Sequence, residues 1–402
     1  MAGTDSFDSF DSFDSFDSFD SFDSFDSFDS FGGRSGGRGK GGMAQALTRS
    51  REGHLGRDLR ELAGQAHKDY PFVPLRNWGV MPPLPTSGQS KYLSAISPGV
   101  RLKIVLVELL GTLNFQCQGD SVAVCQVGVP IAKLTRPDFG FFQQQAERVE
   151  SWAALRTERA PEILSQIGPQ FAYWSSLVGL NPSLMPYTRQ LLALALAYSS
   201  HVVQYIKFKL PVPRPFELSP RVQPMIETPG FFAFPSGHAT QAYMAAELLS
   251  LLVDGGRHSL PNSNRTPTTE ETRTQLRRQA ERIATNRVVA GLHYPIDSAG
   301  GQVLGHGLAN SLCELAIGQS DWQPYEFKID PARYPAVTDF DPAPLERGCT
   351  QPDISFAHRL GGDTHPLLGG TPYGKRVPES SLTPLSWLWH QAAHEWHRVN
   401  IA

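Results

Sequence analysis

Apolar residues recur at helical spacing through the middle of the chain. From residue 141 to residue 318, the 3.6-residue period predicts six helices separated by glycine, proline and polar stretches. The predicted helices are 141–158, 161–180, 183–208, 237–253, 272–291 and 295–318. We place Pro161 and Pro295 in first turns, where a missing N–H costs little. The pattern favours a mainly α fold, a helical bundle flanked by irregular N- and C-terminal segments.

The flanking regions follow other patterns. Apolar segments 100–113 and 120–134 fit either short strands or buried pieces of helix, because periodicity alone does not separate the two. Ten prolines between Pro324 and Pro384 exclude long helices there and predict an irregular segment that wraps the bundle.

The first residues form a low-complexity tail. Asp-Ser-Phe repeats nine times from Asp5 to Phe31, and a Gly-rich stretch follows to Gly42. A three-residue period matches neither a helix nor a half-buried strand, so we expect disorder, with weak association through the regularly spaced Phe rings as the alternative. The expected regions are a tail (1–42), a mixed N-terminal region (43–135), a helical catalytic core (136–320) and a Pro-rich wrapping segment with a terminal helix (321–402).

Composition narrows the class of protein. A net charge of −3 over 402 residues argues against a nucleic-acid surface. The apolar run 190–206 is shorter than the roughly 20 residues that a membrane span needs, so we expect no integral span. No basic segment followed by an apolar stretch opens the sequence. We therefore expect a soluble, cytoplasmic protein with reduced thiols, and export stays open.

Three short segments concentrate cations, a hydroxyl and two histidines. They carry Lys207 with Arg214, then Ser236-Gly237-His238, then Arg287 with His293 and Asp297. Each alone has an ordinary interpretation: a helix end, an N-cap and a surface ion network. Their joint presence favours one anion site at an end of the bundle.

The chemistry of oxyanion binding explains why cations, a hydroxyl and histidines occur together in these segments. A multiply charged anion in a partly dry site needs several cations, and Lys207, Arg214 and Arg287 supply three. The Ser236 hydroxyl and the Gly237 N–H add neutral donors at the start of a predicted helix.

Two histidines then remain for reaction chemistry. The four-residue step from His293 to Asp297 lets the carboxylate bond one ring nitrogen, which fixes the tautomer and leaves the other nitrogen as nucleophile or ligand. His238 is the candidate acid–base group.

These segments resemble the signature of the type 2 phosphatidic acid phosphatase superfamily, which includes acid phosphatases, lipid phosphatases and vanadium-dependent haloperoxidases. The signature reads Lys-x6-Arg-Pro, Pro-Ser-Gly-His and Ser-Arg-x5-His-x3-Asp. The resemblance covers roughly residues 190 to 310 and departs at Asn286, where the family usually has Ser.

The resemblance implies a role for each residue of the site. Lys207, Arg214 and Arg287 would bind equatorial oxygens with help from Ser236 and Gly237, and Asp297 would orient His293. In a haloperoxidase, His293 would be the apical ligand of vanadate and His238 would help to activate peroxide. In a phosphatase, which needs no cofactor, His293 would form a phosphohistidine and His238 would protonate the leaving group.

The soluble character and the long helical region before the motifs resemble the haloperoxidase branch. We therefore expect hydrogen peroxide and halide as substrates, with a phosphomonoester as the alternative and a non-catalytic binding module as a second alternative. An oligomer is compatible with each of them. Phe231, seven residues before His238, matches an aromatic or His position close to the vanadate in haloperoxidases and is our candidate for a substrate or halide pocket; the alternative is a hydrophobic loop that packs on the core.

The C-terminal segment offers a competing site. His390, His394 and His397 have helical spacing suited to a transition metal. The alternative, which we favour, is an amphipathic terminal helix anchored by three tryptophans, Trp387, Trp389 and Trp396. Four cysteines lack the paired spacing of a zinc site; they are Cys117, Cys125, Cys313 and Cys349.

Overall fold

The structure is a computed structural model that describes residues 90–168, 170–258, 267–318, 324–329, 336, 338–342, 354–356 and 383–401. The predicted tail, residues 1–42, lies outside these ranges, as do Cys349 and most of the predicted wrapping segment.

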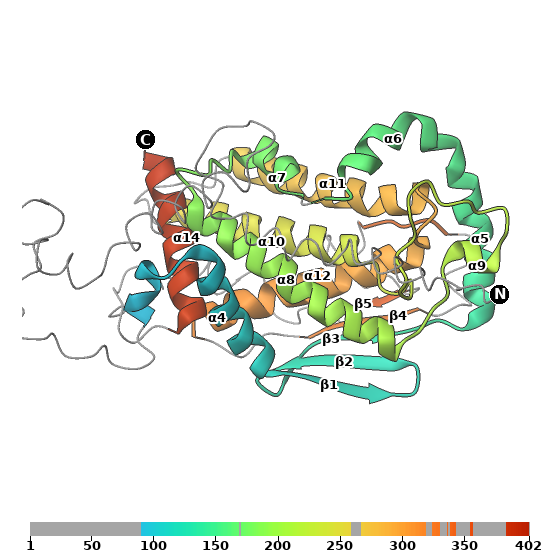
Figure 1. Cartoon of the computed structure of the whole chain (residues 1–402), viewed down its shortest axis with the longest axis horizontal. Helices are drawn as coiled ribbons and strands as arrows, with labels where there is room; N and C mark the ends of the chain where they lie inside the picture. Colours follow the sequence, from blue (N-terminus) through green and yellow to red (C-terminus); the bar gives the residue numbers. More distant parts are fainter. Residues whose placement is uncertain are drawn as a thin grey trace, which may run out of the picture. The chain divides into compact units, whose positions relative to one another are not determined.

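The described residues are mainly helical, as the sequence pattern predicts (Figure 1). The α-helices are α4 (Pro98–Gly111), α5 (Phe139–Ser151), α6 (Arg156–Ser165), α7 (Phe171–Val178), α8 (Pro186–Lys209), α9 (Pro215–Leu218), α10 (Gly237–His258), α11 (Pro267–Val289), α12 (Pro295–Ala316) and α14 (Pro384–Ile401). Two 3-10 helices, η3 (Ser90–Ala95) and η4 (Trp152–Leu155), and five strands accompany them: β1 (Leu113–Gln118), β2 (Ser121–Gln126), β3 (Val129–Thr135), β4 (Tyr325–Ile329) and β5 (Ile354–Phe356).

Helix α10 lies at the centre of the bundle and contacts α8, α11, α12 and α14. Its apolar residues, including Tyr243 and Leu248, are fully buried. A helix that buries apolar residues against four neighbours is stable only inside a bundle. The start of α10 therefore holds the candidate site residues that it carries in a rigid position.

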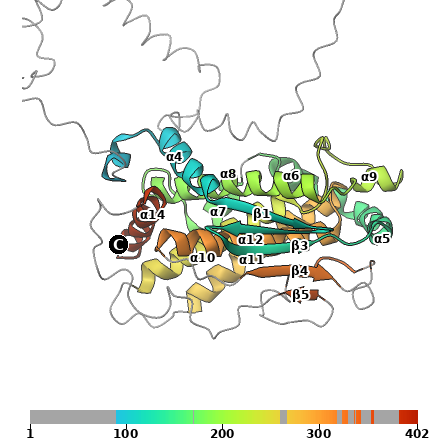
Figure 2. The ribbon, with the colours of Figure 1, turned by 90° about the horizontal axis from the view of Figure 1, so that it is seen from below.

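The strands form one sheet in the order β1-β2-β3-β4-β5, which lies beside α12 (Figure 2). Strands β1, β2 and β3 form an antiparallel meander, whereas β4 runs parallel to β3 and antiparallel to β5. The ambiguous segment 100–113 is thus mainly helix α4, and 120–134 is strand. The chain after α12 returns to pair with a strand that precedes the bundle.

The structure corrects three local predictions. Pro161 does not lie in a first turn, because α6 begins at Arg156 and contains it. The predicted helix 141–158 is divided at Trp152 by η4, and the predicted helix 161–180 is divided into α6 and α7. Gly168 lies in the break between α6 and α7. Pro295 is in the first turn of α12, as predicted.

Helix α14 uses its tryptophans as apolar anchors. Trp387, Trp389 and Trp396 are buried, whereas His394 is exposed. In the portion of the chain that the structure describes, no three His, Cys, Asp or Glu side chains are grouped so that they could hold a metal ion. No helix within those same ranges is both long enough and apolar enough to cross a membrane.

Candidate active site

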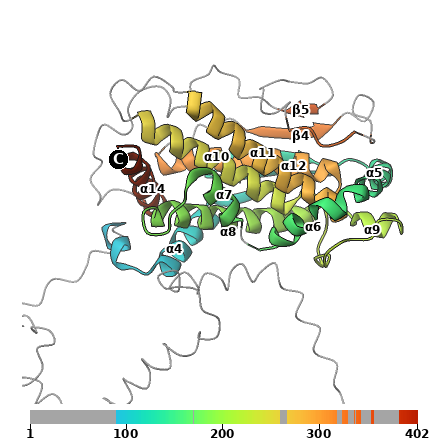
Figure 3. The same ribbon diagram turned by 90° about the horizontal axis from the view of Figure 1, so that it is seen from above.

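The ends of five helices carry the candidate residues. Lys207 lies in the last turn of α8, and Arg287 lies in the last turn of α11. Arg214 precedes α9, Ser236 precedes α10, and Asp297 is in the first turn of α12. Figure 3 shows α8, α10, α11 and α12 running side by side, with α9 beyond their right-hand end. Segments separated by up to 90 residues in the sequence therefore supply one site.

Two glycines allow the close approach of these segments. A Cβ at Gly301 of α12 would lie 2.8 Å from the backbone oxygen of Ser236, so only glycine lets α12 approach the start of α10 this closely. Gly291 has a φ of 81° in the turn between α11 and α12, where a side chain would be strained. That turn carries the chain from Arg287 to His293.

His293 contacts two partners in the buried interior. Its Nδ1 lies 2.9 Å from Asp297 Oδ2, and its Nε2 lies 3.1 Å from Arg214 Nη1. A guanidinium can only donate, so Nε2 carries the lone pair and Nδ1–H donates to the carboxylate. Burial and the charge of Arg214 hold the pKa of His293 well below its ordinary value. The ring is therefore neutral, and its nucleophilic nitrogen points at a cation.

Asp297 fixes both the ring and the start of α12. Its Oδ2 also accepts the backbone N–H of Tyr294 at 3.0 Å, and its backbone oxygen accepts the N–H of Ser236 at 2.9 Å. Burial raises the pKa of Asp297 to about 7, against the opposing effects of Lys207, the Tyr294 N–H and Arg214. This residue joins the second and third sequence segments.

Backbone carbonyls of the loop before α10 hold two of the cations. Lys207 Nζ donates to the oxygens of Phe232 and Ala233 at 2.7 and 2.6 Å. Arg214 Nε donates to the oxygen of Phe231 at 2.9 Å. Burial and the neighbouring Arg214 charge lower the pKa of Lys207 well below its usual value, and burial lowers that of Arg214 to about 10.

The side chain of Phe231 lies against the same two cations. Its ring centroid is 5.3 Å from Lys207 Nζ and 5.1 Å from Arg214 Cζ. These distances are typical of cation–π contacts. The loop therefore contributes both carbonyl oxygens and an aromatic face to the cationic site.

Several buried guanidinium N–H groups of the site have no hydrogen-bond partner among the described residues. They are Nη2 of Arg214, and Nε and Nη1 of Arg287. Both side chains are buried, and an unsatisfied buried donor costs roughly 1–3 kcal/mol, more when it is charged. Burial also lowers the pKa of Arg287 to about 10. An oxyanion would satisfy these donors and stabilise the cations, so the residues present fit such a ligand.

His238 occupies the first turn of α10 and contacts α6. Its Nε2 lies 3.1 Å from the backbone oxygen of Gln166. Because a carbonyl only accepts, Nε2 carries the proton and Nδ1 is the acceptor nitrogen of the neutral ring. Burial and the nearby Arg287 charge lower the pKa of His238 to about 3. The site therefore brings two neutral imidazoles close to the side chains of Lys207, Arg214 and Arg287.

Ser236 and Gly237 begin α10. Ser236 Oγ accepts the Ala239 N–H at 3.4 Å, which is an N-cap contact, and its own hydroxyl proton remains a possible donor. A Cβ at Gly237 would meet only Val203 Cγ1 at 3.8 Å. No contact within the described protein therefore requires glycine at position 237.

Gln166 is a site residue that the sequence did not reveal. Its Oε1 accepts from Arg287 Nη2 and from Asn286 Nδ2, each at 3.1 Å, while its backbone oxygen accepts from His238. Asn286 in turn accepts Arg159 Nη1 on its Oδ1 at 3.2 Å. The amide of Asn286 therefore bridges Gln166 and Arg159. The serine that the family usually has here has a single hydroxyl oxygen, which could not bridge both partners in the same way. Gln166 directly follows α6, and only the packing of α6 on α11 brings it to the site.

Replacing Gln166 by alanine is expected to weaken sulfate binding by about ten- to a hundredfold, since a hydrogen bond to a charged group contributes about 1.5–3 kcal/mol. Arg287 Nη2 would lose one of its two acceptors and keep only the backbone oxygen of Ile163. Titration calorimetry of the full chain measures the effect. Gln302→Ala is the matched control, because Gln302 is equally buried and donates to the oxygen of Pro342. Equal losses in both variants would contradict a positioning role for Gln166.

Sulfate binding is also expected to strengthen as the pH falls from about 7 to about 5. The pKa of His238 is about 3 in the free site, and a bound anion offsets the cations that help to depress it. A pKa that is higher in the complex means that binding takes up protons, so acid favours the complex. Calorimetry across this range tests the sign, with sulfate as a probe that stays dianionic. In His238→Gln the slope should decrease, and an affinity that weakens in acid would contradict the argument.

Comparison with known proteins agrees with this geometry. Residues 187–316 match the sequence model of the PAP2 superfamily, and this range contains every cation and histidine of the site. A search of curated proteins finds no match to the chain. The helix ends, the buried arginine donors and the His293–Asp297 pair thus lie within a PAP2 superfamily domain, which this chain carries at residues 187–316.

Proposed function

We propose that the chain is a vanadate-dependent haloperoxidase-like enzyme that oxidises halide with hydrogen peroxide. The observation that carries the proposal is a set of buried arginine donors with no partner among the described residues, in a site where Arg214 contacts His293 Nε2. These donors and the neutral histidine fit a small oxyanion with one nitrogen ligand. When bound, vanadate supplies a Lewis acid that activates peroxide for oxygen transfer to a halide.

The protein's own part is to bind and orient. Arg214 and Arg287 would donate to the anion's oxygens, and Lys207 would add a point charge held by the loop carbonyls. Asp297 keeps the proton on His293 Nδ1, so Nε2 remains available as the ligand. The start of α10, at Ser236 and Gly237, presents a hydroxyl and helix N–H groups to negative charge.

His238 is compatible with this chemistry. Its Nε2 proton is committed to the Gln166 oxygen, and the low pKa leaves Nδ1 as a proton acceptor. An acceptor suits removal of a proton from hydrogen peroxide. Phe231, which covers Lys207 and Arg214, would supply an apolar wall that excludes water from the halide.

The second candidate is a metal-free acid phosphatase. The pair of His293 and Asp297 supports it, because a neutral imidazole with a fixed tautomer is also an activated nucleophile. A phosphohistidine would form at Nε2, and His238 would protonate the leaving group. That step needs a proton on His238, which a bound dianion would favour by offsetting the cations. A non-catalytic anion-binding module would use the same cations without turnover.

One set of assays on the full chain separates the three functions. The proposal predicts that protein incubated with orthovanadate retains it through gel filtration and brominates a dye when peroxide and bromide are added. A phosphatase would instead hydrolyse a phosphomonoester without added metal, be inhibited by vanadate and give a phosphohistidine after acid quench. Trapping that intermediate, with no bromination at saturating vanadate and peroxide, would replace the first candidate by the second. Anion binding without either activity would leave the binding module.

A further inference from the structure

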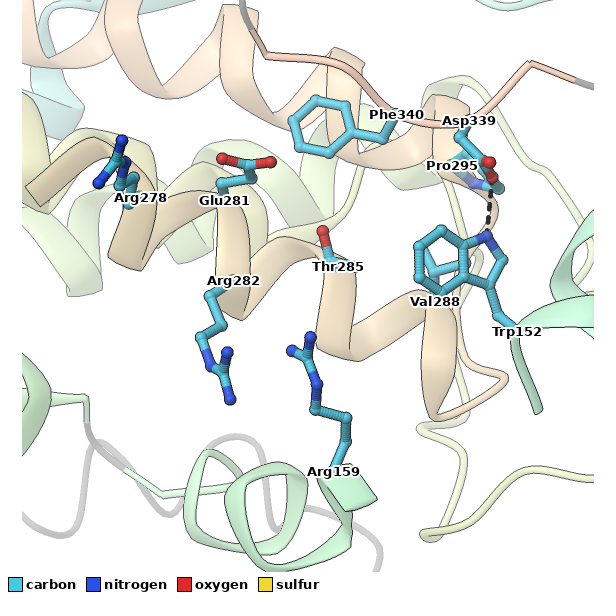
Figure 4. A pocket seen from close by; sticks show the side chains of 10 residues that line it. All are labelled: Trp152, Arg159, Arg278, Glu281, Arg282, Thr285, Val288, Pro295, Asp339 and Phe340. Atoms are coloured by element: carbon cyan, nitrogen blue, oxygen red, sulfur yellow. Dashed lines mark hydrogen bonds between the residues drawn. The ribbon is translucent and has the colours of Figure 1, made fainter. Parts of the chain in front are cut away.

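A second pocket lies on another face of α11. It has a volume of about 390 Å³, and Trp152, Arg159, Arg282, Thr285 and Phe340 are among its lining residues (Figure 4). None of the anion-site residues described above lines it. Its size suits a small organic molecule, and its wall combines aromatic rings with charged groups.

Two arginines give one side of the pocket its positive charge. In Figure 4 the side chains of Arg159 and Arg282 converge below Thr285. Arg282 Nε lies 2.7 Å from each carboxylate oxygen of Glu162, and its Nη2 lies 2.6 Å from one of them. Arg159 Nη1 bonds Asn286, and its buried Nε has no hydrogen-bond partner among the described residues, although Glu158 lies 3.6 Å away. Because each guanidinium has five N–H donors, both retain capacity for a bound anion.

Two aromatic rings stand at the other side. The indole Nε1 of Trp152 donates to Asp339 Oδ1 at 2.7 Å, which fixes the ring. Asp339 is also paired with Arg148, so its charge is compensated from outside the pocket. Phe340 follows Asp339 and faces the same space.

The remaining charged groups do not close the pocket to an anion. Glu281 lies next to Arg278 along the upper edge in Figure 4, away from Arg159. Burial and the charge of Asp341 raise the pKa of Glu281, while Arg278 opposes this. The pocket is therefore polarised, with its available donors on the side of Arg159 and Arg282 and its aromatic surface on the side of Trp152 and Phe340.

We propose that this pocket binds a small aromatic carboxylate. The carboxylate lies between Arg159 and Arg282, where planar guanidinium forks match its two oxygens. The aromatic ring packs against Trp152 and Phe340. The Thr285 hydroxyl adds a neutral donor between the two groups. This inference does not rest on the proposed function, because binding is measured without turnover.

Titration calorimetry of the full chain with benzoate tests the proposal. We expect benzoate to bind, and Arg282→Gln to weaken its binding by about tenfold or more, as for the loss of a charge-assisted contact. Benzyl alcohol has the ring without the carboxylate. The wild type should bind it no more tightly than Arg282→Gln binds benzoate. Arg221→Gln is the matched control, since Arg221 is exposed, pairs with Glu150 and does not line the pocket.

Two further variants make the outcome unambiguous. Thr285→Phe fills the pocket without removing a charge and should abolish benzoate binding, even if Arg282→Gln proves unstable in a melting experiment. Arg214→Gln disrupts the anion site beside His293 and should leave benzoate binding unchanged. The proposal is overturned if benzoate does not bind in the millimolar range, if Thr285→Phe binds it as the wild type does, or if Arg214→Gln loses it.

Discussion

Replacing His293 by alanine is expected to abolish tight vanadate retention and peroxide-dependent bromination. The substitution removes the nitrogen that faces Arg214 and is held by Asp297, while Lys207, Arg214 and Arg287 remain. A vanadate without its nitrogen ligand would be held by charge alone and would wash out. Vanadium content after gel filtration measures retention, and dye bromination measures turnover.

The control for this variant is His201→Ala, because His201 is exposed on α8 and outside the site. It should retain vanadium and activity. Unchanged vanadium content in His293→Ala, with intact folding, would mean that another residue is the ligand.

Replacing His238 by alanine is expected to lower turnover by roughly 10²–10⁴ while vanadate still binds, since this is the usual contribution of general acid–base catalysis. His238 contacts Gln166, and the charge of Arg287 helps to lower its pKa. In this proposal it is not the apical ligand of the anion. The steady-state rate of bromination and the vanadium content are measured on the same sample.

His238→Gln separates proton transfer from positioning. Its amide can still donate to the Gln166 oxygen, but it cannot take up a proton near neutral pH. The glutamine variant should therefore be as slow as the alanine variant. Recovery of most of the rate by glutamine would show that the contact with α6, and not proton transfer, is what the histidine contributes.

The charged and reactive groups of the site could be predicted from the sequence because each is a polar residue at a spacing with a chemical meaning. The four-residue step from His293 to Asp297 is an example, and the structure places the two 2.9 Å apart. The mainly helical fold could be predicted for a similar reason, because long segments with helical periodicity leave few alternative secondary structures.

The supporting contacts could not be predicted because they depend on packing between distant segments. Gln166 reaches Arg287 only because Ile163 of α6 packs against the turn that follows α11. The carbonyl oxygens that accept from Lys207 are backbone atoms, so no residue type in the sequence predicts this contact. The parallel pairing of β3 with β4 joins strands nearly 200 residues apart, and a period of two residues says nothing about such partners.

Pro161 shows a different limit. A proline after a polar stretch favours a helix start, but α6 already begins at Arg156, and the helix accommodates the ring in its interior. Ile163, in the same helix as Pro161, packs against Val289 and Leu292 and stabilises α6 there. Tertiary packing therefore outweighed the local preference.

The central claim is that the buried donors and His293 form one oxyanion site. A crystal structure of the protein soaked with orthovanadate tests it most directly. We predict density for a single anion joined to His293 Nε2, with its oxygens accepting from Arg214 Nη2 and from Arg287 Nε and Nη1. An anion bound elsewhere, with these three donors still unpartnered at saturating vanadate, would contradict the claim.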